Sequence, residues 1–375
     1  MSGLVPGVDP DGLLEYSVVF TDRALNHMSK RFQGAMRDIL RILKTVYGAR
    51  AAIVVPGSGS FGMEAVARQF ATGKRCLVIR DGWFSYRWTQ IFDEGDITSE
   101  ARVLKARATE SGPQPFFAPP PVDDVMAAIA EFRPEVVFAA HVETASGILL
   151  PDDYIRRIAA ATHDVGGLFV LDCIASGALW VDMREVGADV LLSAPQKGWS
   201  ASACCGLVML GEEARRRIDA TQGTSFALDL RKWLGIMEAY EKGGHAYYAT
   251  LPTDSLLVLR DAMVEAEACG FDRLRDEQQK LGNAIRALLA EHGFKSVAAP
   301  GFESPGVVVS YTKDDGIHST RKFTAVGVQA AAGVPLAVDE PKGFKTFRIG
   351  LFGLDKLHHV DRTVASLGQA LERMH

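Results

Sequence analysis

Several features that would direct the chain to a membrane or to nucleic acid are missing from the sequence. No apolar run approaches the roughly 20 residues that a transmembrane helix needs. The first residues lack the charged and then apolar pattern of a secretory signal. The 41 basic and 46 acidic residues give a net charge of −5, which offers no electrostatic basis for binding nucleic acid or a membrane surface. We therefore expect a cytoplasmic protein that binds neither.

Cysteine is scarce and is not arranged in pairs that would indicate a disulfide framework. The adjacent cysteines at 204 and 205 lack the spacing of zinc ligands, so we expect no metal site. An odd number of scattered thiols, mostly in apolar stretches, favours a reduced protein with buried cysteines. The five residues are Cys76, Cys173, Cys204, Cys205 and Cys269.

What the sequence does contain is a regular alternation of short apolar stretches and helical patterns between about residues 51 and 210. With 375 residues, of which 47% are apolar, the chain can form one large domain and a smaller one. This alternation is typical of a mostly parallel sheet covered by helices on both faces. The predicted fold class is therefore α/β.

Two of the apolar stretches end beside residues that can carry chemistry. Asp172 follows the predicted strand 167–171, and Lys197 follows the predicted strand 188–193 after a short turn. In open α/β sheets, ligands bind at the C-terminal ends of the strands. An enzyme that uses pyridoxal phosphate needs a lysine to hold the aldehyde as a Schiff base and a carboxylate beside the pyridine nitrogen. Asp172 and Lys197 fit these roles, although both residue types are also common at exposed loop ends.

A glycine–serine loop, Pro56-Gly57-Ser58-Gly59-Ser60, lies upstream between a predicted strand and a predicted helix. Free backbone N–H groups, hydroxyls and the positive end of a helix dipole bind phosphate at such a loop. Two other interpretations stay open at this point. Ser60 can be a simple helix N-cap. The loop with Gly62 also matches the G-x-G-x-x-G dinucleotide pattern, for which Asp81 would supply the acidic residue.

Taken together, these residues resemble the class V aminotransferases of pyridoxal phosphate fold type I, in particular the alanine/serine–glyoxylate aminotransferase group. The resemblance implies a large domain, with a mostly parallel sheet of seven strands covered by helices, and a small C-terminal α/β domain. It runs from about residue 26 to the C-terminus. Six ordered stretches carry it, at 56–60, 82–87, 141–147, 172–176, 193–197 and 347–353.

The resemblance also implies a role for each matching residue. Lys197 would be the Schiff-base lysine and proton shuttle, and Asp172 would pair with the pyridine nitrogen. Arg348 would clamp the substrate carboxylate, because its planar guanidinium binds a carboxylate through two parallel hydrogen bonds. The other implied cofactor ligands are Ser58, Gly59, Ser60 and Gln196 around the phosphate, Phe84 stacked on the ring, Thr144 beside the ring hydroxyl, and Tyr247 and Thr250 at the phosphate of the partner subunit.

Most of these side chains have an ordinary structural interpretation as well. Phe84 can be a core residue, and the adjacent Trp83 competes with it for the stacking position. Arg348 can form a surface ion pair, although an arginine within an apolar strand favours a functional role. Thr144 can cap a loop, and Tyr247 can pack at an interface. We expect His141 to be a hydrogen-bonded histidine without a catalytic role.

The family pattern divides the chain into an N-terminal arm at 1–27, a large cofactor-binding domain at 28–252 and a small domain at 253–375. The active site would lie between the domains and at the interface of a homodimer, because Tyr247 and Thr250 reach the neighbouring subunit. Helices are expected at 28–47, 122–132, 254–268 and 360–374, and strands of the small domain at 296–299, 306–311 and 346–350.

Two activities compete on this fold. An aminotransferase would move the amine of alanine, serine or aspartate to glyoxylate or pyruvate by a ping-pong mechanism, whereas a lyase or desulfurase would release a fragment. Desulfurases of this group usually have histidine before the lysine, whereas Gln196 precedes Lys197 here, which favours transfer. The family's His-Arg-Ser segment reads His27-Met28-Ser29 in this chain. The amino donor therefore stays open and includes phosphonate, ureido and aromatic amines.

Overall fold

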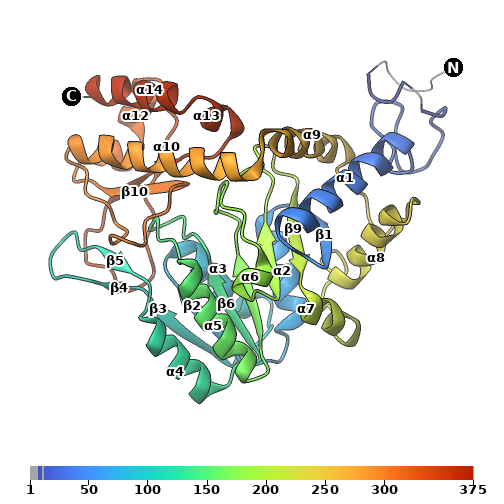
Figure 1. Ribbon diagram of the computed structural model, residues 1–375, viewed down its shortest axis with the longest axis horizontal. Helices are drawn as coiled ribbons and strands as arrows, with labels where there is room; N and C mark the ends of the chain where they lie inside the picture. The colour runs from blue at the N-terminus through green and yellow to red at the C-terminus, as the bar shows by residue number, and fades with distance from the viewer. Residues whose placement is uncertain (1–6, 11, 375) are drawn as a thin grey trace.

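The computed structural model describes residues 7–10 and 12–374, and its largest element is a seven-stranded sheet (Figure 1). Strand β9 runs antiparallel to both of its neighbours, and the other neighbouring strands pair in parallel. The predicted mostly parallel α/β sheet is confirmed. Across the sheet the strands are β1 (Ala51–Pro56), β9 (Cys205–Leu210), β8 (Val190–Ser193), β7 (Leu168–Asp172), β6 (Val136–Ala140), β2 (Cys76–Arg80) and β3 (Ala101–Lys105).

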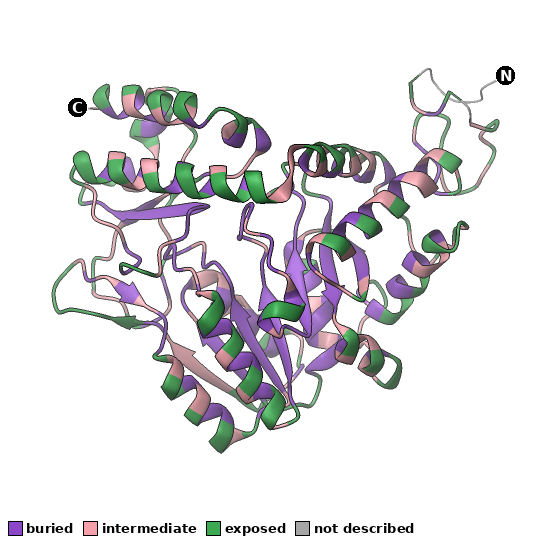
Figure 2. Ribbon diagram, in the orientation of Figure 1, coloured by how far each residue is buried: buried purple, intermediate pink, exposed green. Residues whose placement is uncertain are grey.

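The central strands are buried along their whole length, as the purple arrows of Figure 2 show. Continuous apolar strands of this kind need helices on both faces of the sheet. Helix α2 packs on β9, α3 on β2, α5 on β7 and α8 on β1. The helices of this part are α1 (Lys30–Val46), α2 (Gly59–Phe70), α3 (Trp83–Glu94), α4 (Val122–Phe132), α5 (Asp152–Asp164), α6 (Met183–Val186), α7 (Glu212–Arg217) and α8 (Leu230–Glu241), and a short 3-10 turn spans Ile218–Ala220.

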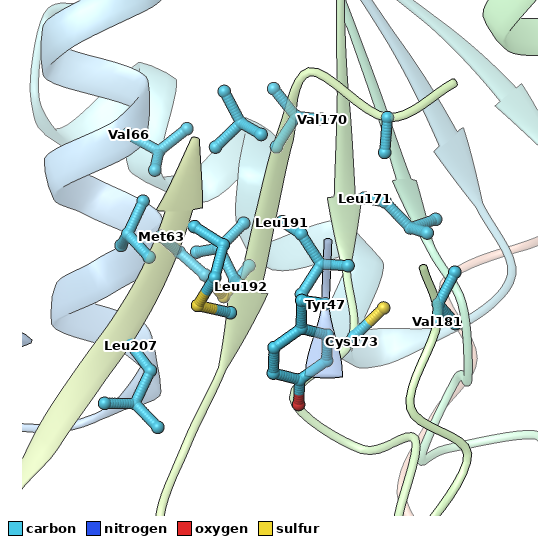
Figure 3. Packing of buried hydrophobic residues seen from close by; sticks show 14 of the residues in the cluster. Tyr47, Met63, Val66, Val170, Leu171, Cys173, Val181, Leu191, Leu192 and Leu207 are labelled. Carbon is cyan, nitrogen blue, oxygen red and sulfur yellow. The ribbon is translucent and has the colours of Figure 1, made fainter. Parts of the chain in front are cut away.

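The core reaches the end of β8, where the functional loop begins. Helix α1 starts at its N-cap Ser29, whose side chain accepts a hydrogen bond from the Phe32 N–H, and it buries its apolar face against β1 and neighbouring helices. The C-cap residue Tyr47 lies among Cys173, Leu191 and other buried side chains (Figure 3). Its hydroxyl donates to Ser193 Oγ at 3.1 Å. This hydrogen bond ties the last residue of β8 to the core immediately before the Lys197 turn.

The C-terminal part forms an antiparallel sheet in the order β10-β12-β11, with long helices beside it (Figure 1). The range 296–299 was expected as a strand, but it makes only single bridges, Ser296 to Ser310 and Ala298 to Phe117, because it is held between two partners over too short a length. The elements are α9 (Thr253–Cys269), α10 (Phe271–Glu291), β10 (Val307–Tyr311), α11 (Asp315–His318), α12 (Arg321–Ala325), β11 (Ala331–Ala332), β12 (Thr346–Gly350), α13 (Leu354–His358) and α14 (Val360–Glu372).

A second apolar cluster joins the two sheets. It contains Val142 and Ala145 from the loop after β6, Val307 and Val309 from β10, and Phe117 from the hairpin of β4 (Arg107–Ala108) and β5 (Phe117–Ala118). The side chains of Phe84 and Phe352 pack against it. The cluster therefore fixes the C-terminal sheet beside the strand ends that carry Asp172 and Lys197.

Of the predicted arm at 1–27, residues 1–6 and 11 lie outside the described residues. In the described part, Asn26 Nδ2 donates to Glu15 Oε2 at 2.7 Å and to Ser17 Oγ at 3.2 Å, which holds the arm near the start of α1. Among the helices of residues 7–10 and 12–374, none combines the length and the apolar character that crossing a membrane would require.

Candidate active site

Asp172 and Lys197 stand at the same edge of the large sheet. Asp172 is the last residue of β7 and pairs in parallel register with Leu192 of β8, and Lys197 lies in the turn after β8. The Asp172 side chain is buried, and its Oδ1 accepts a hydrogen bond from the Ile174 N–H at 2.9 Å. Burial raises the pKa of Asp172 to about 6, because desolvation disfavours the carboxylate. A positively charged N–H donor placed beside it would restore the ionised form.

Lys197 is surrounded by cations and by an aromatic ring. Burial lowers the pKa of Lys197, and the positive charges of Arg348 and Arg87 lower it further. Its Nζ lies 5.1 Å from the centroid of the Phe352 ring. A lysine with a lowered pKa has more of its amine unprotonated at neutral pH, and the unprotonated amine is the nucleophile that attacks an aldehyde.

A cavity of about 180 Å³ brings together most of the residues predicted for the cofactor. Met63, Ala140, Val142, Ile174 and Ala175 supply its apolar wall, and Arg87 adds a cation. The predicted residues that line it are Ser58, Gly59, Ser60, Phe84, Thr144, Asp172, Gln196 and Lys197.

The glycine–serine loop leaves polar groups free to face this cavity. Ser58 is the N-cap residue of α2, yet its side chain makes no capping hydrogen bond, so its hydroxyl is available to a ligand. Gly57 has a φ of 126°, which favours glycine, and a Cβ there would lie 2.6 Å from the Phe61 ring. A Cβ on Gly59 would lie 2.8 Å from Ile174 Cδ1. Glycine at these two positions avoids both clashes, and the start of α2 lies beside the cavity, where the N–H groups of a helix N-terminus can bind an anion.

A second cavity of about 530 Å³ adjoins the first one, and Phe84, Thr144 and Lys197 line both. Arg348, the predicted carboxylate clamp, lines only this larger cavity. It projects from β12, its Nε donates to the Ala332 carbonyl at 2.9 Å, and its guanidinium lies 5.5 Å from the centroid of the Phe84 ring. The cofactor side and the substrate side of the predicted site thus meet at Lys197.

Phe84, and not its neighbour Trp83, faces the two cavities. Phe84 lines both cavities, whereas Trp83 lines neither and packs against Tyr86 with the ring centroids 5.4 Å apart. The guanidinium of Arg87 lies 5.2 Å from the Phe84 centroid. Two arginines therefore contact this ring, one from the cofactor side and one from the substrate side.

Sequence reasoning missed three residues at the site. Arg87 lines the smaller cavity and donates to Ser60 Oγ at 2.8 Å, and Phe352 lines the larger cavity. Glu143 lies behind the site and accepts hydrogen bonds from the first turn of α3. All three belong to stretches that carry the family resemblance. Arg87 could have been found, because it stands three positions after Phe84 on one helix face.

Tyr247 and Thr250 lie apart from both cavities. Tyr247 Oη is 3.2 Å from Thr250 Oγ1, so the two side chains form a hydrogen-bonded pair. Tyr247 is 53% exposed in the single chain. Neither residue lines the cavity that holds Lys197. Within one subunit, therefore, the structure does not bring them to the site.

The alternative interpretations of the upstream loop do not agree with the geometry. Ser60 is inside α2, and the N-cap position is Ser58. Asp81 is fully buried, lines neither cavity, and burial together with Glu143 raises its pKa. A fully buried carboxyl group that lines neither cavity cannot reach a ribose hydroxyl of a ligand bound there. His141, in turn, has its Nδ1 2.8 Å from Ser176 Oγ, and burial lowers its pKa to about 4.

Comparison with known proteins gives the family. The model of the class-V aminotransferases matches residues 14–321, and the chain belongs to this family. A 2-aminoethylphosphonate–pyruvate transaminase of Paraburkholderia xenovorans is 28% identical over 365 residues, which cover 94% of this chain and 90% of the relative. The alanine–glyoxylate aminotransferase of Rattus norvegicus is 24% identical over 363 residues, with 93% and 83% covered.

Solved structures give the same fold. An aspartate aminotransferase of subgroup IV from Thermus thermophilus superposes with a TM-score of 0.76 at 21% identity and covers 94% of each chain. A cysteine desulfurase from Thermococcus onnurineus has a TM-score of 0.65 at 15% identity, with 92% of this chain and 84% of the desulfurase covered. The desulfurase is thus the more distant of these two neighbours. The family implies pyridoxal phosphate as the cofactor.

The residues of the smaller cavity fit that cofactor. It needs a phosphate site, a lysine for the aldehyde, a carboxylate for the pyridine nitrogen and a surface for the ring. The free hydroxyl of Ser58 and the backbone at Gly59 suit the phosphate. Asp172 is a buried carboxyl whose Oδ1 alone has a protein hydrogen-bond donor within the described residues. Lys197 supplies the amine for the aldehyde, and Phe84 supplies the surface for the ring.

Proposed function

We propose that this protein is a pyridoxal phosphate-dependent transaminase that moves an amino group from a small amino acid to a 2-oxo acid such as pyruvate or glyoxylate. One observation carries the proposal: a single cavity is lined by Asp172, Lys197 and the loop 58–60, and it opens to a second cavity that holds Arg348. The relatives whose names include pyruvate or glyoxylate support the choice of acceptor.

When bound, the cofactor supplies an aldehyde that carries the amino group and a ring that withdraws electrons from the substrate carbon. Ser58, Gly59, Ser60 and Gln196 would hold its phosphate, and Thr144 would hydrogen bond at the ring hydroxyl. Asp172 would accept a hydrogen bond from the N–H of the protonated pyridine nitrogen, which keeps the ring positively charged. Phe84 would cover one face of this ring through stacking and cation–π attraction.

Lys197 would hold the cofactor through Nζ and, once released, would take a proton from the substrate carbon and deliver it to the cofactor carbon that had borne the aldehyde. Its lowered pKa suits both roles, since each requires the free amine. Arg348 would bind the substrate carboxylate through its two terminal nitrogens, because Nε is already bonded to the Ala332 carbonyl. This contact would place the substrate carbon beside Nζ in the larger cavity.

We also propose a cytoplasmic homodimer with shared sites, in which Tyr247 and Thr250 bind the phosphate in the partner subunit. The support is that this pair lies away from its own cavity and that large apolar side chains near the arm and loops are exposed. They include Leu13, Tyr16 and Val18 in the arm and Phe226 in the loop before α8, and Phe61 on α2 is exposed as well. The division into a large domain at 28–252 and a small domain at 253–375 belongs to the same proposal.

The test is a visible absorption spectrum of the purified holoprotein during titration with single amino acids and then with pyruvate or glyoxylate. A transaminase should lose the band of the lysine-bound cofactor with a donor and regain it with the acceptor. Release of ammonia or sulfide without any acceptor would instead assign the protein to the lyases, the second candidate. A protein that never binds pyridoxal phosphate would refute both.

A further inference from the structure

The larger cavity has an unusual charge distribution. Three cationic side chains line it, Lys197, Arg348 and Lys356, and the described residues that line it include no aspartate or glutamate. Its volume of about 530 Å³ falls within the range of about 300–1,000 Å³ typical of small-molecule sites. A site with several cations and no acidic residue attracts ligands with more than one negative charge.

Two of these cations already have roles in the proposed function. Lys197 must be free of charge when it acts as a base, and Arg348 binds one carboxylate. The phosphate of the cofactor does not account for Lys356, because Lys356 is absent from the residues that line the smaller cavity. The positive charge of Lys356 on the substrate side therefore has no assigned partner.

Lys356 is held in place but is not neutralised. It belongs to α13, is half-buried, and its Nζ donates to the Phe352 carbonyl at 2.8 Å. A carbonyl uses one of the three ammonium protons and contributes no negative charge. Within the described residues Lys356 has no ion pair, whereas the adjacent Asp355 binds Arg362 at 2.7 Å. The hydrogen bond directs the ammonium group and leaves two donors for a ligand.

Lys356 is linked to Lys197 through a single residue, Phe352. The carbonyl that holds it belongs to Phe352, whose ring lies over Lys197 Nζ. The strand that precedes Phe352 carries Arg348. A substrate held by Arg348 beside Lys197 would extend its far end into the cavity that Lys356 lines. Thr363 and Ser366 of α14 line the same cavity and offer hydroxyl groups there.

We propose that Lys356 binds a second anionic group of the substrate, so that the preferred donor or oxo acid carries two anionic groups, the second a carboxylate or a phosphonate. The inference rests on the proposed transaminase function and adds the substrate class. An ammonium group on a half-buried side chain should improve the binding of a ligand with two anionic groups by about tenfold, the range of one charge-assisted hydrogen bond.

The test measures binding of unreactive anions to the holoprotein by calorimetry. Succinate and 3-phosphonopropionate carry two anionic groups, and propionate carries one. Lys356→Gln removes the charge and keeps a polar donor, whereas Lys356→Arg keeps the charge. Lys313→Met is the control, because Lys313 is exposed, belongs to the same part of the chain and lines neither cavity. The midpoint of thermal unfolding shows that each variant is folded.

We expect Lys356→Gln to weaken the binding of succinate or 3-phosphonopropionate about tenfold and that of propionate much less, and Lys356→Arg to restore most of the loss. The anion that is weakened more identifies the second group as carboxylate or phosphonate. An equal loss for all three anions, or the same loss in Lys313→Met, would overturn the proposal. Succinate binding that depends on Lys356 in a protein without amine transfer would refute the transaminase function alone. If the protein transfers amines but Lys356→Gln binds the three anions with the same relative affinities as the wild-type protein, the Lys356 proposal alone is refuted.

Discussion

Glu143 accepts hydrogen bonds from both the backbone N–H and the hydroxyl of Ser85, at 2.8 and 2.6 Å. Its other oxygen accepts from the Phe84 N–H at 3.1 Å and the Ala145 N–H at 2.9 Å. The residue before α3 is Gly82, which has no side chain to cap the helix, so a carboxyl group from a distant loop does this. Glu143 is thus a positioning residue for Phe84.

Replacing Glu143 should therefore lower the stability of the fold. Glu143→Ala would leave several buried donors without an acceptor, and we expect it to lower the free energy of unfolding by about 2–4 kcal/mol. Glu94→Ala, on the exposed face of the same helix, is the control and should change it by less than about 0.5 kcal/mol. Urea unfolding measures the free energy of unfolding of both variants. Equal stability of the two variants would contradict the capping role.

Lys197 should be indispensable for attachment of the cofactor. Lys197→Ala removes the only atom proposed to bond the aldehyde, so the visible band of the holoprotein should be absent and the transfer rate should fall by at least about 10³-fold. Lys313→Met removes an exposed lysine and should keep both. Absorption spectra recorded after addition of pyridoxal phosphate measure the lysine-bound band in each variant. If this band persists in Lys197→Ala, another lysine must bind the cofactor.

Asp172 predicts a specific pH dependence of stability in the cofactor-free protein. Its pKa is raised from 3.8 to about 6 in the folded state, so between these values the folded chain keeps a proton that the unfolded chain releases. Stability from this group is therefore lost as the pH rises through that window. Asp172→Asn keeps the acceptor for the Ile174 N–H but does not ionise. Its advantage over the wild-type protein should grow by about 2–3 kcal/mol between pH 4 and 8.

Chemical unfolding of the cofactor-free proteins at several pH values measures this difference, in which contributions from other carboxylates cancel. The exposed residue Asp93, replaced by Asn, is the control for the substitution itself. A difference that stays constant with pH would show that Asp172 is ionised to the same extent in the folded and unfolded chains. The burial of this carboxyl group would then have no consequence for its titration.

Much of the fold could be predicted from the sequence, because in most elements the local apolar pattern agrees with the burial seen in the structure. The strands that are buried on both faces are continuous apolar runs, and helix α4 begins and ends where its pattern predicts, at Val122 and Phe132. The short range 296–299 was predicted less well. Its apolar residues suit a strand. A strand also needs to pair with a partner over several residues, and the partners of this range come from distant parts of the chain.

The site divides in the same way. That Asp172, Lys197 and the loop 58–60 lie together at one cavity could be predicted, because each of them follows a strand or begins a helix at the same edge of the sheet. Glu143 and Lys356 could not, since their importance arises from contacts made by tertiary structure. A glutamate that caps a helix more than 50 residues away, at Ser85, leaves no periodic signal in the sequence.

Arg348 should govern substrate binding and leave cofactor binding intact. Arg348→Ala removes the two terminal nitrogens that would bind the carboxylate, so KM for the amino donor should rise roughly 100-fold. Arg348→Lys supplies a point charge without the planar fork and should recover only part of this loss. Cofactor content, read from absorbance, should stay at the wild-type level in both, because Arg348 does not line the smaller cavity. An unchanged KM would place the carboxylate elsewhere.

The shared site of the proposed homodimer predicts complementation between two inactive variants. One subunit carries Lys197→Ala, and the other carries Tyr247→Ala with Thr250→Ala. If the Tyr247–Thr250 pair serves the partner subunit, a heterodimer contains one site with every residue intact and one site with both defects. A heterodimer isolated through two different affinity tags should then show about half of the wild-type activity at saturating cofactor. If the pair serves its own subunit, both sites of the heterodimer are damaged, and its activity would not exceed the mean of the two parent variants.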